Sequence, residues 1–163
     1  MTPEQQLVDA ALRAWKSNAD RTAAFFGALS DAELEQEVAP GRNRLLYLWG
    51  HLTAVSDALL PLLGIGPRLH PELDAPFLTS PDRAEGVTLP SAGDLKRMAA
   101  EIDDALWSAF SRWSPADWVA KHTAVSDDDF AREPHRNRFS VLLSRTSHMA
   151  FHYGQAILVK PRE

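Results

Sequence analysis

The sequence predicts an all-α fold: a four-helix bundle with a long connection between its second and third helices. Four segments repeat apolar residues every three or four positions over about four to six turns, the period of one buried helix face. No segment shows the strict alternation of a half-buried strand. The chain has 163 residues and 45% hydrophobic content, which suits one domain with one core. We therefore expect residues 1–163 to form a single bundle domain.

The first long helix is predicted to begin at the N-terminus and to end near Leu29. Thr2 is a capping residue, and Pro3 stands at the first helical position, where its missing N–H costs nothing. An apolar stripe then recurs every three or four residues as far as Leu29. Ser30 repeats the capping pattern and predicts a short helical turn, which Pro40 should end.

The second long helix is predicted to be capped by Asn43 and to kink or stop at Pro61. Its buried stripe contains one histidine, His51, which should point into the core or along its edge. Alone, an inward histidine is more often a satisfied core residue than a metal ligand. The stripe on this helix consists of Leu45, Leu48, Leu52, Val55 and Leu59.

The segment 64–90 is predicted to be a long crossover loop. It contains five prolines and shows no sustained apolar period. A connection of this length without structure of its own is unusual in a small domain, and often forms a lid or one wall of a site. We interpret His70, which lies in it, as solvated.

The second half of the chain repeats this order. Ser91 begins the third long helix, Ser114 caps another short turn, and residues 121–136 are polar. The three consecutive aspartates at 127–129 point in different directions, so we expect them to be solvated rather than to bind a cation. Asn137 then caps the fourth long helix.

The fourth helix carries the most informative motif, His148 and His152. Residues four apart on a helix share one face, with Cβ atoms about 5–6 Å apart, close enough to bind one metal ion together. The residue after His148 is Met149, where a zinc protease needs a glutamate, so that class is excluded. Pro161 lies just beyond the expected end of this helix.

Facing helices of a bundle build its ligand sites, so His51 can face His148 and His152. Three imidazoles suit zinc, nickel, iron(II), cobalt or manganese, and they leave a coordination position open. Gln155 and Ser144 lie one turn from the histidine pair and are expected to contact the second ring nitrogens or to line the pocket. The competing interpretation is three core or surface histidines that never meet.

Composition excludes several other classes. The formal net charge is −5 and no run of Lys or Arg occurs, so we expect no nucleic-acid partner. We expect no apolar run to reach the roughly 18 residues of a membrane span, and residues 1–20 lack a signal-peptide pattern, so we expect a cytoplasmic protein without a membrane partner. With no cysteine, the chain supplies neither a disulfide nor a thiol.

Two motifs resemble the DinB-like superfamily: a histidine on the second helix within residues 47–52, and His-x-x-x-His followed by Gly-Gln at residues 148–155. This superfamily includes damage-inducible bacterial proteins and thiol-dependent transferases. The resemblance implies a four-helix bundle, a divalent metal held by His51, His148 and His152, a homodimer and a role in stress responses. It also implies an S-transferase in which the metal activates a low-molecular-weight thiol, such as bacillithiol or mycothiol.

Two other functions stay open at this stage. One is a metal-dependent hydrolase that uses a metal-bound hydroxide. The other is a non-catalytic metal-binding protein of the stress response. The sequence assigns no catalytic residue beyond the candidate ligands, and it leaves the metal and the substrate unnamed.

Overall fold

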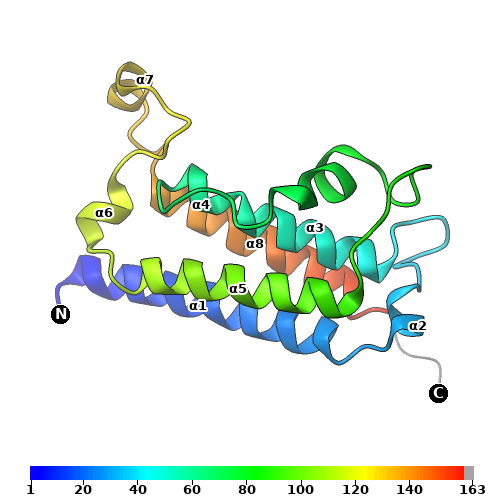
Figure 1. Cartoon of the computed structure of the whole chain (residues 1–163). Coiled ribbons are helices and arrows are strands. Elements are labelled where there is room, and N and C mark those ends of the chain that lie inside the picture. The colour runs from blue at the N-terminus through cyan, green and yellow to red at the C-terminus, as the bar shows by residue number, and fades with distance from the viewer. Residues whose placement is uncertain (160–163) are drawn as a thin grey trace.

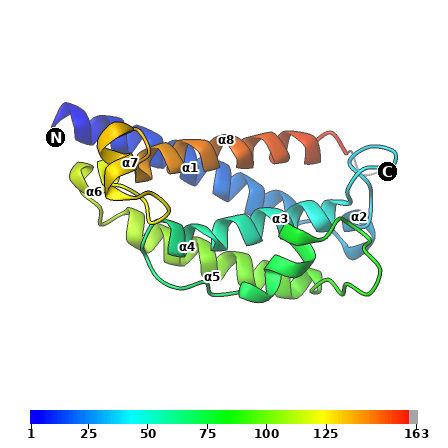
Figure 2. The ribbon, with the colours of Figure 1, turned by 90° about the horizontal axis from the view of Figure 1, so that it is seen from above.

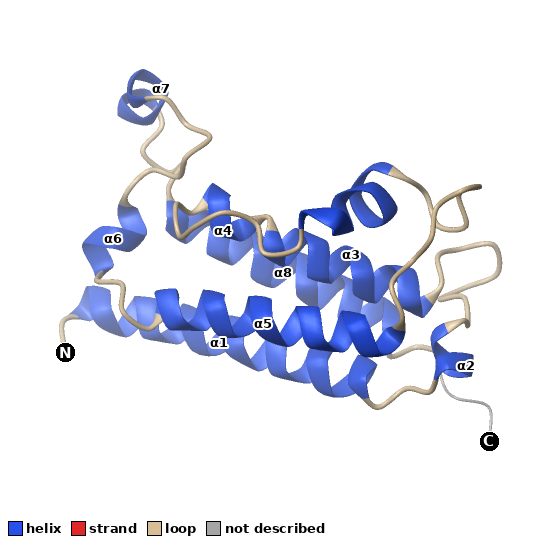
Figure 3. Cartoon of the chain, in the orientation of Figure 1, coloured by secondary structure: helices blue, strands red, loops and turns tan. Residues whose placement is uncertain are grey.

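The all-α prediction is confirmed. A computed structural model describes residues 1–159, in which every regular element is helical apart from two isolated β-bridges (Figure 3). Four long helices lie side by side: each of α1 and α3 packs against both α5 and α8 (Figures 1 and 2). Their bounds are α1 Pro3–Gly27, α3 Leu45–Asp57, α5 Ala92–Phe110 and α8 Arg138–Ala156.

Short helical elements fill the connections between the long helices. Four of them are α-helical turns: α2 Asp31–Leu34, α4 Leu59–Leu62, α6 Pro115–Val119 and α7 Asp127–Arg132. Two more lie between α4 and α5: a 3₁₀ turn, η1 Pro71–Leu73, and a π-helical turn, η2 Ala75–Thr79. The acidic triplet at 127–129 forms the first turn of α7, where Asp127 and Asp128 are exposed and Asp129 is half-buried.

Most predicted helix starts are confirmed by cap hydrogen bonds. The side chains of Thr2, Ser30, Ser91, Ser114 and Asn137 each accept from a backbone N–H three residues later. These bonds satisfy donors that the first turn of a helix leaves free.

Asn43 was wrongly predicted as the cap of the second long helix. The N-cap of α3 is Arg44, which makes no side-chain cap bond. A bridge between Glu37 and Arg44 holds this part of the chain extended, and the N–H of Leu45 donates to the carbonyl of Gln36. The bridge therefore delays the start of the helix.

The predicted break at Pro61 is confirmed, with its effect one turn earlier. α3 ends at Asp57, four residues before the proline, and α4 continues from Leu59. Proline has no N–H to donate to the carbonyl four residues before it, so the helical ladder is interrupted there. Pro161, the predicted stop of the last helix, lies outside the described residues, and α8 ends at Ala156.

α3 is the most enclosed of the long helices, since nine of its 13 residues are buried. By length and composition the stretch Leu45–Leu62 is apolar enough to cross a membrane, so the expectation that no run reaches a span was wrong on this count. Most of the stretch, 61%, is buried inside the fold. This is the pattern of the core helix of a soluble protein.

The connection between α4 and α5 is not the structureless loop that the sequence indicated. η1 and η2 both pack against α3. Asp57, fully buried at the end of α3, accepts from Arg68 Nε at 2.7 Å and from the backbone N–H groups of Leu69 and His70. Nearer the start of α3, the Tyr47 hydroxyl donates to the carbonyl of Ser80 at 2.6 Å. The connection is thus fastened along the length of the helix.

His70 is partly buried rather than solvated. Its Nδ1 lies 3.1 Å from Glu72, and its Nε2 lies 2.8 Å from Glu101 on α5. The ring therefore joins the connection to the third long helix.

The tryptophans of α1, α5 and α6 differ in how deeply they are buried. Trp15 and Trp118 are 1% and 0% exposed, and Phe110 lies in edge contact with Trp15. Trp107 is 37% exposed and stacks on Trp15 with a centroid separation of 6.3 Å. This aromatic cluster closes the end of the bundle at which α1 begins.

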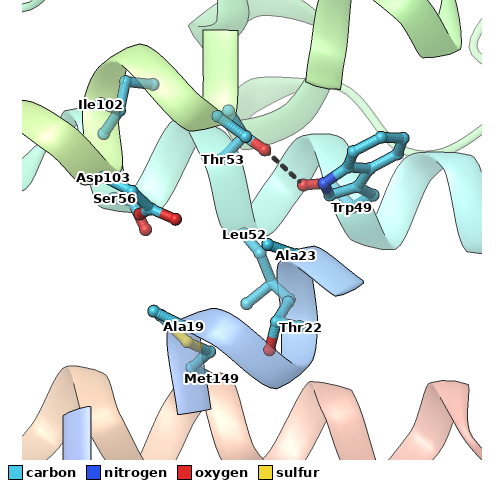
Figure 4. Close-up of a pocket in the computed structure, with 11 residues that line it drawn as sticks. Ala19, Thr22, Ala23, Trp49, Leu52, Thr53, Ser56, Ile102, Asp103 and Met149 are labelled. Carbon is cyan, nitrogen blue, oxygen red and sulfur yellow. Dashed lines mark hydrogen bonds between the residues drawn. The ribbon is translucent and has the colours of Figure 1, made fainter. Parts of the chain in front are cut away.

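A small cavity of about 30 Å³ lies among the four long helices (Figure 4). Thr22 and Asp103 contribute polar groups to its lining, and the hydroxyl of Thr22 finds no hydrogen-bond partner within residues 1–159. Burial raises the pKa of Asp103 to about 6, and the negative charges of Asp20 and Asp104 act in the same direction, whereas Lys16 opposes them. The fold therefore favours the protonated form of this carboxyl group.

Replacing Asp103 by asparagine should stabilise the protein at neutral pH. An unfolded aspartate loses its proton near pH 4, whereas the folded one holds it to about pH 6, so stability falls between these values as pH rises. We expect Asp103→Asn to raise the free energy of unfolding at pH 7 by roughly 1–3 kcal/mol, and by little at pH 4. Urea unfolding at both pH values measures this, with Asp104→Asn as the exposed control. An equal change in the free energy of unfolding at both pH values would contradict a raised pKa of Asp103.

Candidate metal centre

The structure brings His51, His148 and His152 together. Nε2 of His148 lies 3.4 Å from Nε2 of His51 and 3.1 Å from Nε2 of His152. One ring nitrogen from each histidine falls within a group whose members all lie within 4.8 Å of one another. His51 comes from α3 and the other two from adjacent turns of α8, so the cluster exists because these two helices pack against each other.

The nitrogen spacing matches that of ligands to one ion. Imidazole nitrogens bind zinc at about 2.0–2.1 Å, and two ligands at roughly 90–110° around one ion therefore lie about 2.9–3.4 Å apart. The two separations of 3.1 and 3.4 Å fall in this range. All three side chains are partly buried, so an ion among them would keep contact with solvent.

The outer nitrogens of two rings fix their tautomers. Nδ1 of His51 donates to the backbone carbonyl of Phe77 at 3.0 Å, and Nδ1 of His152 donates to Oε1 of Gln155 at 2.8 Å. Because oxygen here only accepts, each Nδ1 carries the proton, and each neutral ring presents a lone pair at Nε2. Both lone pairs face Nε2 of His148. That nitrogen carries at most one proton, so it can donate a hydrogen bond to only one of the two facing nitrogens. A cation at the centre would satisfy all three nitrogens.

Burial keeps the cluster in its ligand form. It lowers the pKa of His148 to about 4, and the neighbouring His152, His51 and Arg145 add to this effect. Burial also lowers the pKa of His152, although its bond to Gln155 acts in the opposite direction. Because metals bind the neutral imidazole, a cation would meet little competition from protons on His148 at pH 7.

The two residues proposed to support the ligands lie in different places. Gln155 contacts the second nitrogen of His152, as described above. Ser144 is exposed and makes no hydrogen bond to His148 in the part of the chain that the structure describes. It lines a pocket beside the N-terminal turns of α8 instead. Sequence reasoning missed the Phe77 carbonyl, because any residue type can supply a backbone oxygen.

A signal for that contact exists in Gly50, the residue before His51. A Cβ atom built on Gly50 would lie 2.1 Å from the ring of Phe77. The ring therefore occupies the place of the missing side chain, and this close approach sets the carbonyl of Phe77 beside the histidine. Figure 1 shows η2, which carries Phe77, lying across α3.

A second pocket, of about 550 Å³, adjoins the cluster. His152 and Gln155 line it together with Leu48 of α3 and Arg42 of the preceding loop. This volume is of the size that small-molecule ligands occupy. The cluster is thus reachable by a small molecule from the side of the α2–α3 loop.

Comparison with known proteins leaves the family open. No protein-family model matches the chain, and no curated protein matches it.

Gly50→Ala should disturb both folding and the metal centre. The added methyl group has to displace the Phe77 ring, and overpacking of this kind costs about 1–3 kcal/mol of stability. Urea unfolding and metal titration together measure the two effects. The matched control is Gly154→Ala on α8, where a Cβ meets open space and stability should rise by up to about 1 kcal/mol. Equal stability of both variants would argue against the packing role of Gly50.

Proposed function

We propose that this protein binds one divalent transition-metal ion through His51, His148 and His152 and uses it for thiol-dependent S-transfer. The observation that supports the metal site is the position of Nε2 of His51 and of His152. They lie 3.4 and 3.1 Å from Nε2 of His148. Three nitrogen ligands suit zinc, nickel, iron(II) or manganese, and leave at least one coordination position for water or a substrate.

The transferase part of the proposal is supported by chemistry and by resemblance. A bound ion supplies a Lewis acid that lowers the pKa of a thiol and holds the thiolate as a nucleophile. The chain has no cysteine, so the thiol has to come from a small cosubstrate. The motifs at residues 47–52 and 148–155 resemble those of the DinB-like superfamily, in which such transferases occur. With that resemblance go a homodimer and a role in stress responses. A cytoplasmic location is proposed from the lack of a signal-peptide pattern in residues 1–20.

The protein's own residues position this chemistry. The Phe77 carbonyl and the Gln155 amide oxygen hold two imidazoles in the tautomer that presents Nε2 to the ion. The neutral state of His148 keeps its nitrogen free for coordination. The pocket that His152 and Gln155 line offers room for a cosubstrate beside one of the candidate ligands.

Metal content is the first test. Untagged wild-type protein should contain about one divalent ion per chain by elemental mass spectrometry, or take one up from zinc, nickel, manganese or iron(II), as one triad provides one site. His51→Ala/His148→Ala should lose the ion, whereas His135→Ala, which removes an exposed histidine outside the triad, should retain it. Retention of the ion by the double variant would overturn the triad.

Thiol binding tests the transferase assignment. In cobalt-substituted protein, a small thiol that reaches the open position should produce a thiolate-to-cobalt absorption band in the near ultraviolet, and this band should be missing from the double variant. A hydrolase would instead cleave an activated ester without any thiol. For a non-catalytic protein, metal removal would lower the melting temperature with neither thiol binding nor turnover.

A further inference from the structure

A cluster of basic and hydroxyl side chains lies along α8, before the metal centre. It lines a pocket of about 300 Å³ between the end of α4, the segment 120–137 and the first turns of α8. In Figure 1 the segment that carries α7 projects beside the start of α8. The polar side chains that line this pocket, which we term the basic pocket, include His122, His135, Arg136, Ser140, Ser144 and Arg145.

The charge of the basic pocket is opposite to that of the whole chain. The chain carries a formal net charge of −5, yet no carboxylate lines this pocket. Arg136 is partly neutralised by Glu133, which lies 3.2 Å away. Arg145 is partly buried, and its guanidinium makes no ion pair or hydrogen bond with residues 1–159. No guanidinium nitrogen of Arg145 is among the buried side-chain atoms that lack a partner, so its five donors stay open to solvent and can meet a ligand.

Neutral groups of the pocket add hydrogen-bonding capacity. Nδ1 of His122 is buried and has no partner within the described residues. Burial and the nearby Arg136 lower the pKa of His122, so the ring is neutral at pH 7 and has one N–H to donate. The hydroxyl groups of Ser140 and Ser144 line the same space. The N-terminal end of α8, with its partial positive charge, lies at this pocket.

The distance to the metal centre suits a small molecule. Ser144 and Arg145 precede His148 by four and three residues on α8, a rise of about 4.5–6 Å along the helix axis. The positive charge of Arg145 is one of the causes of the lowered pKa of His148. The backbone positions of Arg145 and His148 are therefore slightly less than one helical turn apart along α8.

We infer that the basic pocket binds an anionic group, a carboxylate or a phosphate, of the molecule whose reactive end meets the triad-bound ion. This inference rests on the proposed function, and it adds the substrate class: a small molecule that carries an anionic group at one end and its reacting atom at the other. Arg145 acts as the principal anion ligand, in a bidentate contact that its planar guanidinium favours.

Titration of metal-free protein with inorganic phosphate, and separately with succinate, tests the basic pocket apart from the metal. Backbone amide NMR signals of Ser140, Ser144 and Arg145 should shift saturably. Arg145→Gln should weaken binding about 10-fold or more, since hydrogen bonds between charged groups contribute about 1.5–3 kcal/mol. Arg13→Gln, which removes an exposed charge on α1 away from both pockets, is the matched control and should leave binding unchanged.

The outcomes separate the two proposals. Tighter binding of phosphate points to a phosphate ester, and tighter binding of succinate points to a carboxylate; either supports the inference. Shifts that map elsewhere, or an affinity unchanged in Arg145→Gln, would overturn it. Arg145→Lys retains the charge without the planar fork and should bind with intermediate affinity, which guards against misfolding of the glutamine variant. Binding that persists in His51→Ala/His148→Ala shows that the pocket stands even if the metal site fails.

Discussion

The packing of Phe77 against Gly50 is the contact on which the rest of this structure depends. α3 is too apolar to leave a face in water, and the ring of Phe77 covers it at the one residue without a side chain. The same contact fixes η2 and places a carbonyl on Nδ1 of His51. The burial of a core helix and the orientation of a metal ligand therefore have one cause.

The connection that covers α3 is a fixed wall rather than a free lid. Buried Asp57 binds Arg68 and two backbone N–H groups, and Tyr47 binds the carbonyl of Ser80, so both ends of the covering segment are held to the helix. A buried carboxylate that lost these partners would be strongly destabilising. The three histidines thus stand on packed helices, which hold side-chain geometry more accurately than loops do.

Charge organises the face of α8 that carries the site. His148 is held neutral by burial and by neighbours that include Arg145, so the centre has strong donors but no negative charge of its own. A divalent ion beside an unpaired arginine leaves an excess of positive charge, which an anionic substrate would balance. Recognition of an anion and coordination of a metal are therefore compatible demands on the same helix.

The sequence alone determined the four long helices, most of their caps and the three histidines, because periodicity, capping and i, i+4 spacing are local properties. Tertiary structure decided the rest. The start of α3 shifted because a bridge between Glu37 and Arg44 competes with the cap at Asn43. The Phe77 carbonyl and the basic pocket arise where segments distant in sequence meet, and no local pattern encodes such meetings. The physical reason is that the apolar surface of α3 has to be covered, and the segments that cover it, η2 and α8, carry the groups that complete the site.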